Sequence, residues 1–182
     1  VVSYQTAWLK YYYPVEFMAA LMTSVIDNPG KVSEYIYSCR QMGIKILPPD
    51  INKGEGSFSV DGGNIRYGLA AIKSIGKPVI ESIIQERKNG GEFSNLKDFI
   101  ERLSGKEVNK RTIESFIKSG AFDSLGGTRK QFMVVYVQIL DQVNRERKYS
   151  MTGQLSLFDI VSDDQKSEFD IFFFENEHYY KY

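Results

Sequence analysis

The stretch of sequence that decides the fold reads Gly68-Leu69-Ala70-Ala71-Ile72-Lys73-Ser74-Ile75-Gly76-Lys77-Pro78-Val79-Ile80-Glu81-Ser82-Ile83-Ile84. Two apolar segments with helical spacing are joined here by the four residues that begin at Ser74. In this turn, Ile75 can fill the space between the helices, and Gly76 tolerates a positive φ or a close backbone approach. Pro78 suits the first turn of the second helix. The pattern therefore predicts two short helices joined by a tight hairpin.

The start of the second helix is a favourable place for a phosphate group. The backbone N–H groups of Gly76, Lys77 and Val79 would lie there without intrahelical acceptors. They would face an anion together with the positive end of the helix dipole, beside a lysine ammonium. A pair of helices that binds nothing has the same spacing, so the spacing alone leaves both interpretations open.

A second unit of similar design follows in the chain. An apolar stripe from Val108 to Ile117 precedes a turn of small residues at 119–122, and a helix with a basic start opens at Thr128. Two such hairpins, about one groove apart, would hold a duplex by its backbone without reading its bases. Taken singly, each lysine is ordinary solvated surface, but their clustering at two turns favours DNA. The residues that we assign to DNA binding are Lys73, Ser74, Gly76, Lys77, Lys110, Arg111, Lys118, Gly120, Arg129 and Lys130.

The charge distribution is consistent with an anionic partner in the middle of the chain. Overall, 23 basic side chains balance 23 acidic ones. Residues 64–130 nevertheless carry 13 basic and 8 acidic side chains, whereas residues 150–182 carry 2 and 7. Basic helices that only expose a solvated face produce the same pattern, so charge alone does not separate the two interpretations.

The remaining pattern predicts a mainly α fold of short helices with a small β-hairpin and a weakly structured acidic tail beyond Tyr149. The β-hairpin spans about residues 57–67, around Asp61-Gly62-Gly63-Asn64. We expect Trp8 and the tyrosines at 11–13 to pack between helices. The predicted helices cover about residues 7–25 with an interruption near Pro14, 31–42, 68–73, 78–88, 95–103, 109–119 and 128–147.

Composition excludes several classes of protein. With 42% hydrophobic and 25% charged residues the chain has ordinary globular composition. A single cysteine, Cys39, rules out an internal disulfide framework and fits a reducing cytoplasm. No apolar run is long enough to span a bilayer, so we expect no membrane partner. The sequence begins at Val1 and enters a helical pattern at once, which we take as the sign of a fragment.

Several long motifs between about residues 3 and 158 resemble those of one protein family and occur in the same order as in that family. They are Tyr4-Gln5-Thr6-Ala7-Trp8-Leu9-Lys10, Tyr13-Pro14-Val15-Glu16-Phe17-Met18-Ala19-Ala20-Leu21, Gly43-Ile44-Lys45-Ile46-Leu47-Pro48-Pro49-Asp50-Ile51-Asn52, Ile65-Arg66-Tyr67-Gly68-Leu69-Ala70-Ala71-Ile72-Lys73, Val108-Asn109-Lys110-Arg111 and Ser119-Gly120-Ala121-Phe122-Asp123-Ser124-Leu125-Gly126. They resemble the C-family replicative polymerases of bacteria, the DNA polymerase III alpha subunits. The resemblance fades after Phe158.

The resemblance implies an organisation in three parts. Residues 1–65 would be the C-terminal part of the polymerase fingers, residues 66–147 a tandem helix-hairpin-helix module that binds duplex DNA, and residues 148–182 a linker or tail. The parent would be a DNA-directed DNA polymerase that uses Mg²⁺ and works with other replisome subunits. The palm carboxylates of that family are absent from this chain. We therefore expect no catalytic residues, no metal ligands, no cofactor and no activity in the fragment alone.

The tail contains a short motif, Gln154-Leu155-Ser156-Leu157-Phe158, which looks like the bacterial pentapeptide that binds the β sliding clamp. Leu157 and Phe158 can fill an apolar pocket as adjacent anchors, while the amide of Gln154 sets the register. An amphipathic stretch packed against the helices is the alternative for this motif. For the chain as a whole, the alternatives are a module whose main role is to hold the clamp, and an accessory hairpin domain of a nuclease, ligase or repair enzyme.

Overall fold

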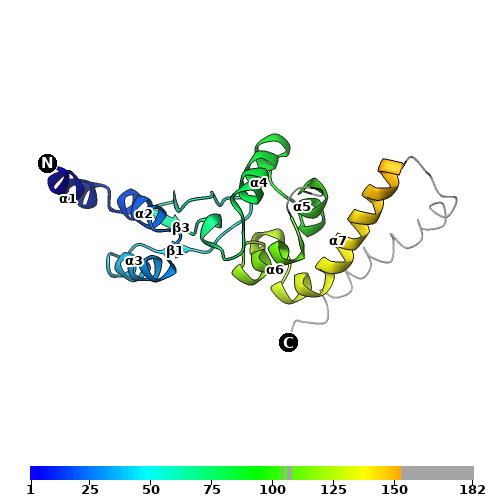
Figure 1. Ribbon diagram of the computed structural model, residues 1–182. Coiled ribbons are helices and arrows are strands. Elements are labelled where there is room, and N and C mark those ends of the chain that lie inside the picture. The colour runs from blue at the N-terminus through cyan, green and yellow to red at the C-terminus, as the bar shows by residue number, and fades with distance from the viewer. Residues whose placement is uncertain (104, 106–107, 153–182) are drawn as a thin grey trace, which may run out of the picture. The chain divides into compact units, whose positions relative to one another are not determined.

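The computed structural model describes residues 1–103, 105 and 108–152, with residues 149–152 described by their backbone only. The chain divides into two compact units, residues 1–143 and 144–182. The described part is mainly helical, as predicted (Figure 1). The predicted weakly structured acidic tail and the clamp motif Gln154–Phe158 lie outside the described residues.

Three helices open the chain: α1 (Val2–Tyr12), α2 (Pro14–Ser24) and α3 (Pro29–Gln41). Pro14 starts α2, which confirms the interruption predicted there. The Asn28 side chain caps α3 by accepting a hydrogen bond from the backbone N–H of Lys31 (3.2 Å). Beyond α3, the chain reverses through Gly43, whose φ of +74° is accessible to glycine at little cost.

A small three-stranded sheet follows, with strand order β1-β3-β2. Its strands are β1 (Ile46–Leu47), β2 (Ser59–Asp61) and β3 (Asn64–Arg66). The antiparallel pair β2–β3 is the predicted hairpin, and β1 adds to β3 in parallel. Arg66 is buried and donates to Asp61 Oδ2 (2.8 Å) and to the carbonyl of Pro48 (3.0 Å), so its charge is used inside the fold.

The first hydrophobic core joins α2 and α3 to this sheet. Met22 and Cys39 are fully buried in it, together with Phe58 and Ile65 from the hairpin. Because Met22 and Cys39 lie on facing helices, their burial holds the two helices over the strands (Figure 1). Burial also raises the pKa of the Cys39 thiol, since the charged thiolate is disfavoured away from water.

A helical region follows the sheet, and one predicted helix in it is wrong. Residues 68–73 form only a single 3-10 turn, η1 (Leu69–Ala71). Gly68, which precedes η1, packs directly on the irregular segment that leads to β2: a Cβ there would lie 2.7 Å from the carbonyl carbon of Ser57 and 2.8 Å from the carbonyl oxygen of Gly56. The backbone bonds from Leu69 to Glu55 and from Ala70 to Gly56 tie η1 to the same segment, so tertiary pairing replaces a helix here.

The other predicted helices are confirmed as α4 (Lys77–Gly90), α5 (Leu96–Leu103), α6 (Lys110–Ser119) and α7 (Arg129–Thr152), with a second 3-10 turn, η2 (Asp123–Leu125), between the last two. The helix α7 continues five residues beyond its predicted end at Arg147. In the part of the chain that the structure describes, no helix is long and apolar enough to cross a membrane.

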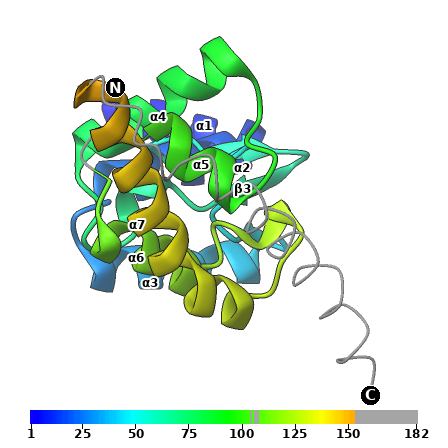
Figure 2. The ribbon, with the colours of Figure 1, turned by 90° about the vertical axis from the view of Figure 1, so that its right-hand side faces the viewer.

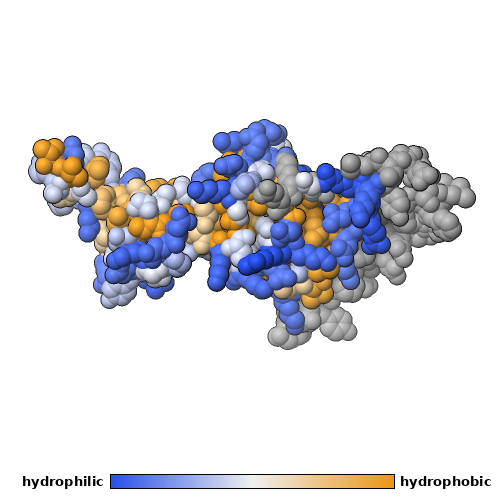
Figure 3. Space-filling view, viewed as in Figure 1, coloured by the Kyte–Doolittle hydropathy of each residue, from blue (hydrophilic) through white to orange (hydrophobic). Residues whose placement is uncertain are grey.

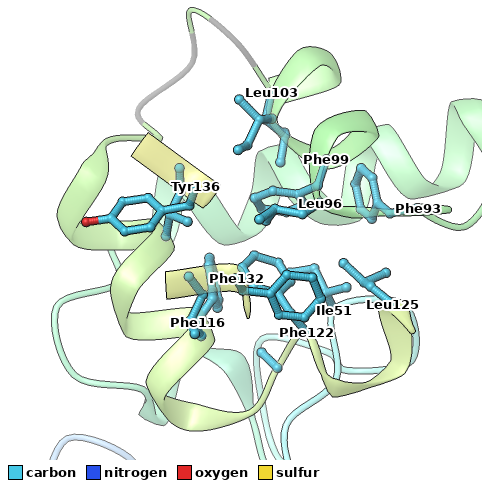
Figure 4. Close-up of a cluster of buried hydrophobic side chains, with 14 of the residues drawn as sticks. Ile51, Phe93, Leu96, Phe99, Leu103, Phe116, Phe122, Leu125, Phe132 and Tyr136 are labelled. Atoms are coloured by element: carbon cyan, nitrogen blue, oxygen red, sulfur yellow. The ribbon is translucent and has the colours of Figure 1, made fainter. Parts of the chain in front are cut away.

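A second hydrophobic core holds these helices together. Phe99 is fully buried at its centre and makes edge-to-face contacts with Phe93, Phe116 and Phe122 (Figure 4). The side chains of this core include those from α4, α5, α6, η2 and the part of α7 up to Val143 (Figures 1 and 2). Ile51 joins them from the loop before β2. The hairpin turns are thus held by one shared core.

Two arginines of this region are structural. Arg87 donates to the carbonyls of Gly54 (2.8 Å) and Ile51 (3.2 Å) and pairs with Glu55. Arg102 lies over the ring of Phe93 at 4.3 Å and donates to the backbone carbonyl of Glu86. Their charges satisfy carbonyls of the fold, so the basic excess counted in the sequence overstates the charge available to a partner.

The helix α1 departs from expectation because it has no buried residue. Trp8 is 42% exposed and Tyr11 is 79% exposed, so the prediction that they pack between helices is wrong for the described chain. The rings of Trp8 and Tyr12 contact each other on the surface. Figure 3 shows hydrophobic side chains on the surface at this end of the molecule.

Candidate nucleic-acid interface

The first hairpin turn, residues 74–77, takes a different backbone path from the one expected. Gly76 has φ −80° and ψ 150°, which any residue can adopt. The positive φ falls instead on Ser74 (+73°), the one non-glycine residue with a positive φ in the described chain. Ile75 is partly buried against the second core. Its side chain therefore fills space between neighbouring elements, as the sequence predicts. The strained position of the turn is therefore a serine.

The start of α4 is open. Gly76 is its N-cap and offers no side-chain acceptor. The first intrahelical hydrogen bond runs from the N–H of Ile80 to the carbonyl of Gly76 (3.3 Å), so the N–H groups of Lys77 and Val79 precede the intrahelical ladder. Lys73 and Lys77 are exposed, and no carboxylate in the described chain pairs with either. Positive charge and unsatisfied donors thus coincide at this turn.

The helix α6 comes close to this turn. The guanidinium of Arg111, in the first turn of α6, donates to Ser74 Oγ at 3.1 Å. A shallow groove of about 550 Å³ lies between the turn and α6. Its lining contains two lysines and three serines and no acidic residue. The polar lining residues are Tyr67, Lys73, Ser74, Ser115, Lys118 and Ser119.

The second hairpin turn is closed by its own side chains. Gly120 ends α6 in the left-handed conformation (φ +84°, ψ 13°), and its N–H donates back to the carbonyl of Ile117 (3.1 Å). Arg129 forms an ion pair with Asp123, donating from Nε to Oδ1 at 2.9 Å. The pair lies against Gly120, since a Cβ there would collide with the Arg129 guanidinium. The hydrogen-bonded guanidinium lowers the pKa of Asp123.

The start of α7 is capped, unlike that of α4. Thr128 Oγ1 accepts from the N–H of Gln131 (3.2 Å), and Gln131 Oε1 accepts from the N–H of Thr128 (2.8 Å). This reciprocal arrangement is a capping box, and it satisfies two backbone donors at this helix start. Lys130 beside it is exposed and has no ion-pair partner in the described chain.

The remaining predicted cations pair within the fold. Lys110 lies 3.5 Å from Asp141, and Lys118 lies 2.9 Å from Glu114. The hydroxyl of Tyr136 also donates to Glu114 (2.6 Å). These hydrogen bonds, first from Tyr136 and then from Lys118, lower the pKa of Glu114. The same bond raises the pKa of Tyr136, since the phenol must keep its proton to donate.

The ten predicted DNA-binding residues therefore fall into separate groups. Lys73, Ser74, Arg111 and Lys118 meet around the groove, whereas Gly76 and Lys77 form the start of α4. Gly120, Arg129 and Lys130 belong to the second turn, and Lys110 faces α7. The sequence-based assignment did not include Ser115 and placed Ser119 only in the second turn, although Arg111, Ser115 and Ser119 follow one another at a spacing of four and so lie on one face of α6.

Within the described residues no group of three or more histidine, cysteine, aspartate or glutamate side chains is arranged to hold a metal ion. The predicted clamp residues Gln154, Leu155, Ser156, Leu157 and Phe158 lie outside those residues.

The turn at 74–77 joins the 3-10 turn η1 to α4, and residues 120–127 join α6 to α7; side chains from both turns pack on the second core. Residues 43–132 match the family described as the helix-hairpin-helix motif. The match includes both turns and the starts of α4 and α7.

Curated relatives show which proteins this region is similar to. The chain is 45% identical over 165 residues to the DNA polymerase III subunit alpha of Escherichia coli strain K12, which is 90% of this chain and 14% of that protein. It is 42% identical over 158 residues (87% of this chain, 13% of the relative) to the subunit of Mycobacterium tuberculosis strain H37Rv. The subunit of Vibrio cholerae is 44% identical over 164 residues. The chain is homologous to a segment of DNA polymerase III alpha subunits and spans about one seventh of their length.

Proposed function

We propose that this chain grips duplex DNA by its phosphate backbone, without sequence preference, as part of a template-directed DNA polymerase. The observation that carries the proposal is the first hairpin turn, where unpaired Lys73 and Lys77 flank the uncapped start of α4. Backbone N–H groups, a helix dipole and ammonium groups together favour a phosphate. The similarity to helix-hairpin-helix proteins and to the polymerase subunits supports the same assignment.

Fluorescence anisotropy of the chain with labelled duplex and single-stranded DNA, over a series of salt concentrations, tests this function. Contact with about five phosphates predicts a slope of log K against log salt of about −4 to −5. We expect the duplex to bind more tightly than the single strand, and unrelated duplex sequences to bind equally. A flat salt response, or strong preference for one sequence, would contradict the proposal.

The variant Lys73→Glu/Lys77→Glu tests the first turn. Loss of two phosphate contacts should weaken duplex binding by roughly tenfold or more at about 0.1 M salt, because each contact contributes a slope of about 0.9. The single variants Lys77→Glu and Lys88→Glu are a matched pair, because each makes the same charge change and Lys88 lies toward the opposite end of α4, eleven residues from Lys77 and so about 16 Å along the helix. Equal effects of Lys77→Glu and Lys88→Glu would remove the turn from the site.

We propose a second role for the tail motif Gln154–Phe158, as the contact with the β sliding clamp. The support is the sequence pattern, in which two adjacent apolar anchors follow a glutamine at fixed spacing. The variant Gln154→Ala/Phe158→Ala should abolish clamp binding in a titration and leave the duplex affinity unchanged. Clamp binding at wild-type strength would overturn this role without affecting the first proposal.

The longer protein supplies the rest of the proposed activity. We propose that residues 1–65 belong to the polymerase fingers and residues 66–147 hold the duplex, while Mg²⁺-dependent nucleotidyl transfer and contacts with other replisome subunits need parts beyond this chain. The isolated chain should accordingly show no primer extension in the presence of Mg²⁺. Primer extension by this chain alone would contradict that division.

A further inference from the structure

The strained serine of the first turn points to a second phosphate contact. An L-residue at positive φ is disfavoured, and such strain persists where the surrounding structure holds it in place. At Ser74 the holding group is Arg111, whose guanidinium donates to the hydroxyl oxygen. A glycine would adopt this backbone without strain, so the serine contributes its hydroxyl.

The donors around this hydroxyl are incompletely used. Ser74 Oγ accepts from Arg111, and its own proton has no acceptor in the described chain. Arg111 has further N–H groups, because a guanidinium carries five. Lys73, which directly precedes Ser74, is exposed and has no ion-pair partner within the described range. A hydroxyl, a guanidinium and an ammonium group are therefore available at this turn, the first two in direct contact.

The groove itself favours an anion. Lys118 lines it from α6, as do Ser115 and Ser119, whose hydroxyls donate to the carbonyls of Arg111 and Phe116. Although Glu114 pairs with Lys118, it does not line the groove, and no acidic side chain does. The apolar residues Pro49, Ala71 and Ile72 also line the groove, so its attraction for a phosphodiester comes from its two lysines and from the absence of acidic side chains in its lining.

We infer that Ser74 and Arg111, together with Lys73, form a phosphate-binding site that adjoins the start of α4, shares Lys73 with it, and takes a second phosphodiester of the bound nucleic acid. This inference rests on the proposed duplex binding and deepens it. The hydroxyl of Ser74 donates to one phosphate oxygen, the guanidinium of Arg111 donates to another, and the ammonium of Lys73 neutralises the charge. The bond from Arg111 to Ser74 holds the two donors at a fixed spacing before DNA arrives.

The variant Ser74→Gly separates fold from binding because its two effects have opposite signs. Glycine removes the strain, so thermal unfolding should rise by roughly 2–4 °C. Loss of the hydroxyl should weaken duplex binding by roughly 3- to 10-fold, with the salt slope unchanged. Arg111→Gln, which removes a charge, should weaken binding further and reduce the salt slope by about 0.9.

A double-mutant cycle tests whether the residues act as one site. Ser74→Gly and Arg111→Gln should combine to less than the product of their single effects, because each disrupts the same phosphate contact. Ser74→Gly and Lys130→Gln should combine as the full product, since Lys130 belongs to the second turn. Duplex binding by Ser74→Gly at wild-type affinity, or multiplicative effects with Arg111→Gln, would overturn the inference while wild-type binding still upholds the proposed function. Failure of the wild-type chain to bind duplex would instead refute both.

Discussion

The two hairpin turns of this chain have similar basic residues and different electrostatics. At the first turn, Lys73 and Lys77 have no carboxylate partner in the described chain, and α4 begins without a side-chain cap. At the second turn, Arg129 pairs with Asp123, and Thr128 caps α7. The first turn therefore presents donors to solvent, whereas most donors of the second turn are satisfied internally.

This difference shows that a basic residue near a turn is only a candidate for phosphate binding until its partners are known. Charge and backbone N–H groups contribute to binding an anion only when the fold leaves them available. The second turn uses the same chemical groups to hold its own backbone, with the ion pair packed on Gly120. We accordingly expect the first turn to dominate duplex affinity and the second to dominate local stability.

Alanine in place of the turn glycines should give the largest contrast. Gly120→Ala introduces a Cβ at φ +84° that collides with Arg129, and should lower the free energy of unfolding by about 1–3 kcal/mol. Gly76→Ala meets only Pro78 Cδ at 3.6 Å, so stability should stay within about 1 kcal/mol of wild type. Urea titrations measure both, and equal losses would remove the proposed difference between the turns.

The helix caps give a second contrast of smaller size. Thr128→Ala removes the cap of α7 and should destabilise the chain by about 1 kcal/mol. Gly76→Asp supplies the cap that α4 lacks and should raise stability by a few tenths of a kcal/mol. Its carboxylate would also occupy the start of α4 and repel a phosphate, so duplex binding should fall while stability rises. Tighter duplex binding by Gly76→Asp would argue against a phosphate at this helix start.

The variant Asp123→Asn tests whether the ion pair between Asp123 and Arg129 keeps Arg129 from contacting DNA. Loss of the carboxylate frees the Arg129 guanidinium, and duplex affinity should rise by about threefold with a salt slope steeper by about 0.9. Stability should fall by no more than about 1 kcal/mol, because the pair is half exposed. Glu114→Gln, which frees Lys118 in the same way, is a matched comparison on α6. An affinity unchanged in Asp123→Asn would assign Arg129 a purely structural role.

The smallest expected effect is a pH dependence confined to the second turn and α6. The folded-state pKa values of Asp123 and Glu114 lie below their ordinary values. Both carboxylates therefore stabilise the fold at a pH above those ordinary pKa values. That contribution is lost as the pH falls through the folded pKa values, below about pH 4. The stability difference between wild type and Asp123→Asn should therefore shrink between pH 5 and pH 3. A constant difference across that range would show that the ion pair does not titrate with folding.

Much of the fold follows from local pattern because local chemistry determines it. Pro14, Asn28 and Asn109 mark helix starts by removing or satisfying backbone N–H groups, and the structure begins α2, α3 and α6 at these points. The residues at 61–64 supply a tight turn, and the hairpin β2–β3 forms around it. Such signals act within a few residues and can be read from the sequence.

The errors in the sequence-based predictions arise where distant segments meet. The predicted helix at 68–73 became a 3-10 turn because its backbone bonds to residues 55 and 56. The positive φ of the first turn falls on Ser74, whose hydroxyl accepts a hydrogen bond from Arg111 of another helix, and not on Gly76, which the sequence marks as tolerant of one. No pattern within the turn contains that partner.

The sequence by itself determined the order of helices, the two turns and the resemblance to polymerase subunits, because spacing and capping residues act locally. Only the tertiary structure decided which charges are available. Carbonyls and carboxylates of other segments accept hydrogen bonds from Arg66, Arg87 and Arg102. Lys73 and Lys77 have no such partners in the described chain. Pairing depends on distances between atoms of different segments, and the packing of the two cores sets those distances.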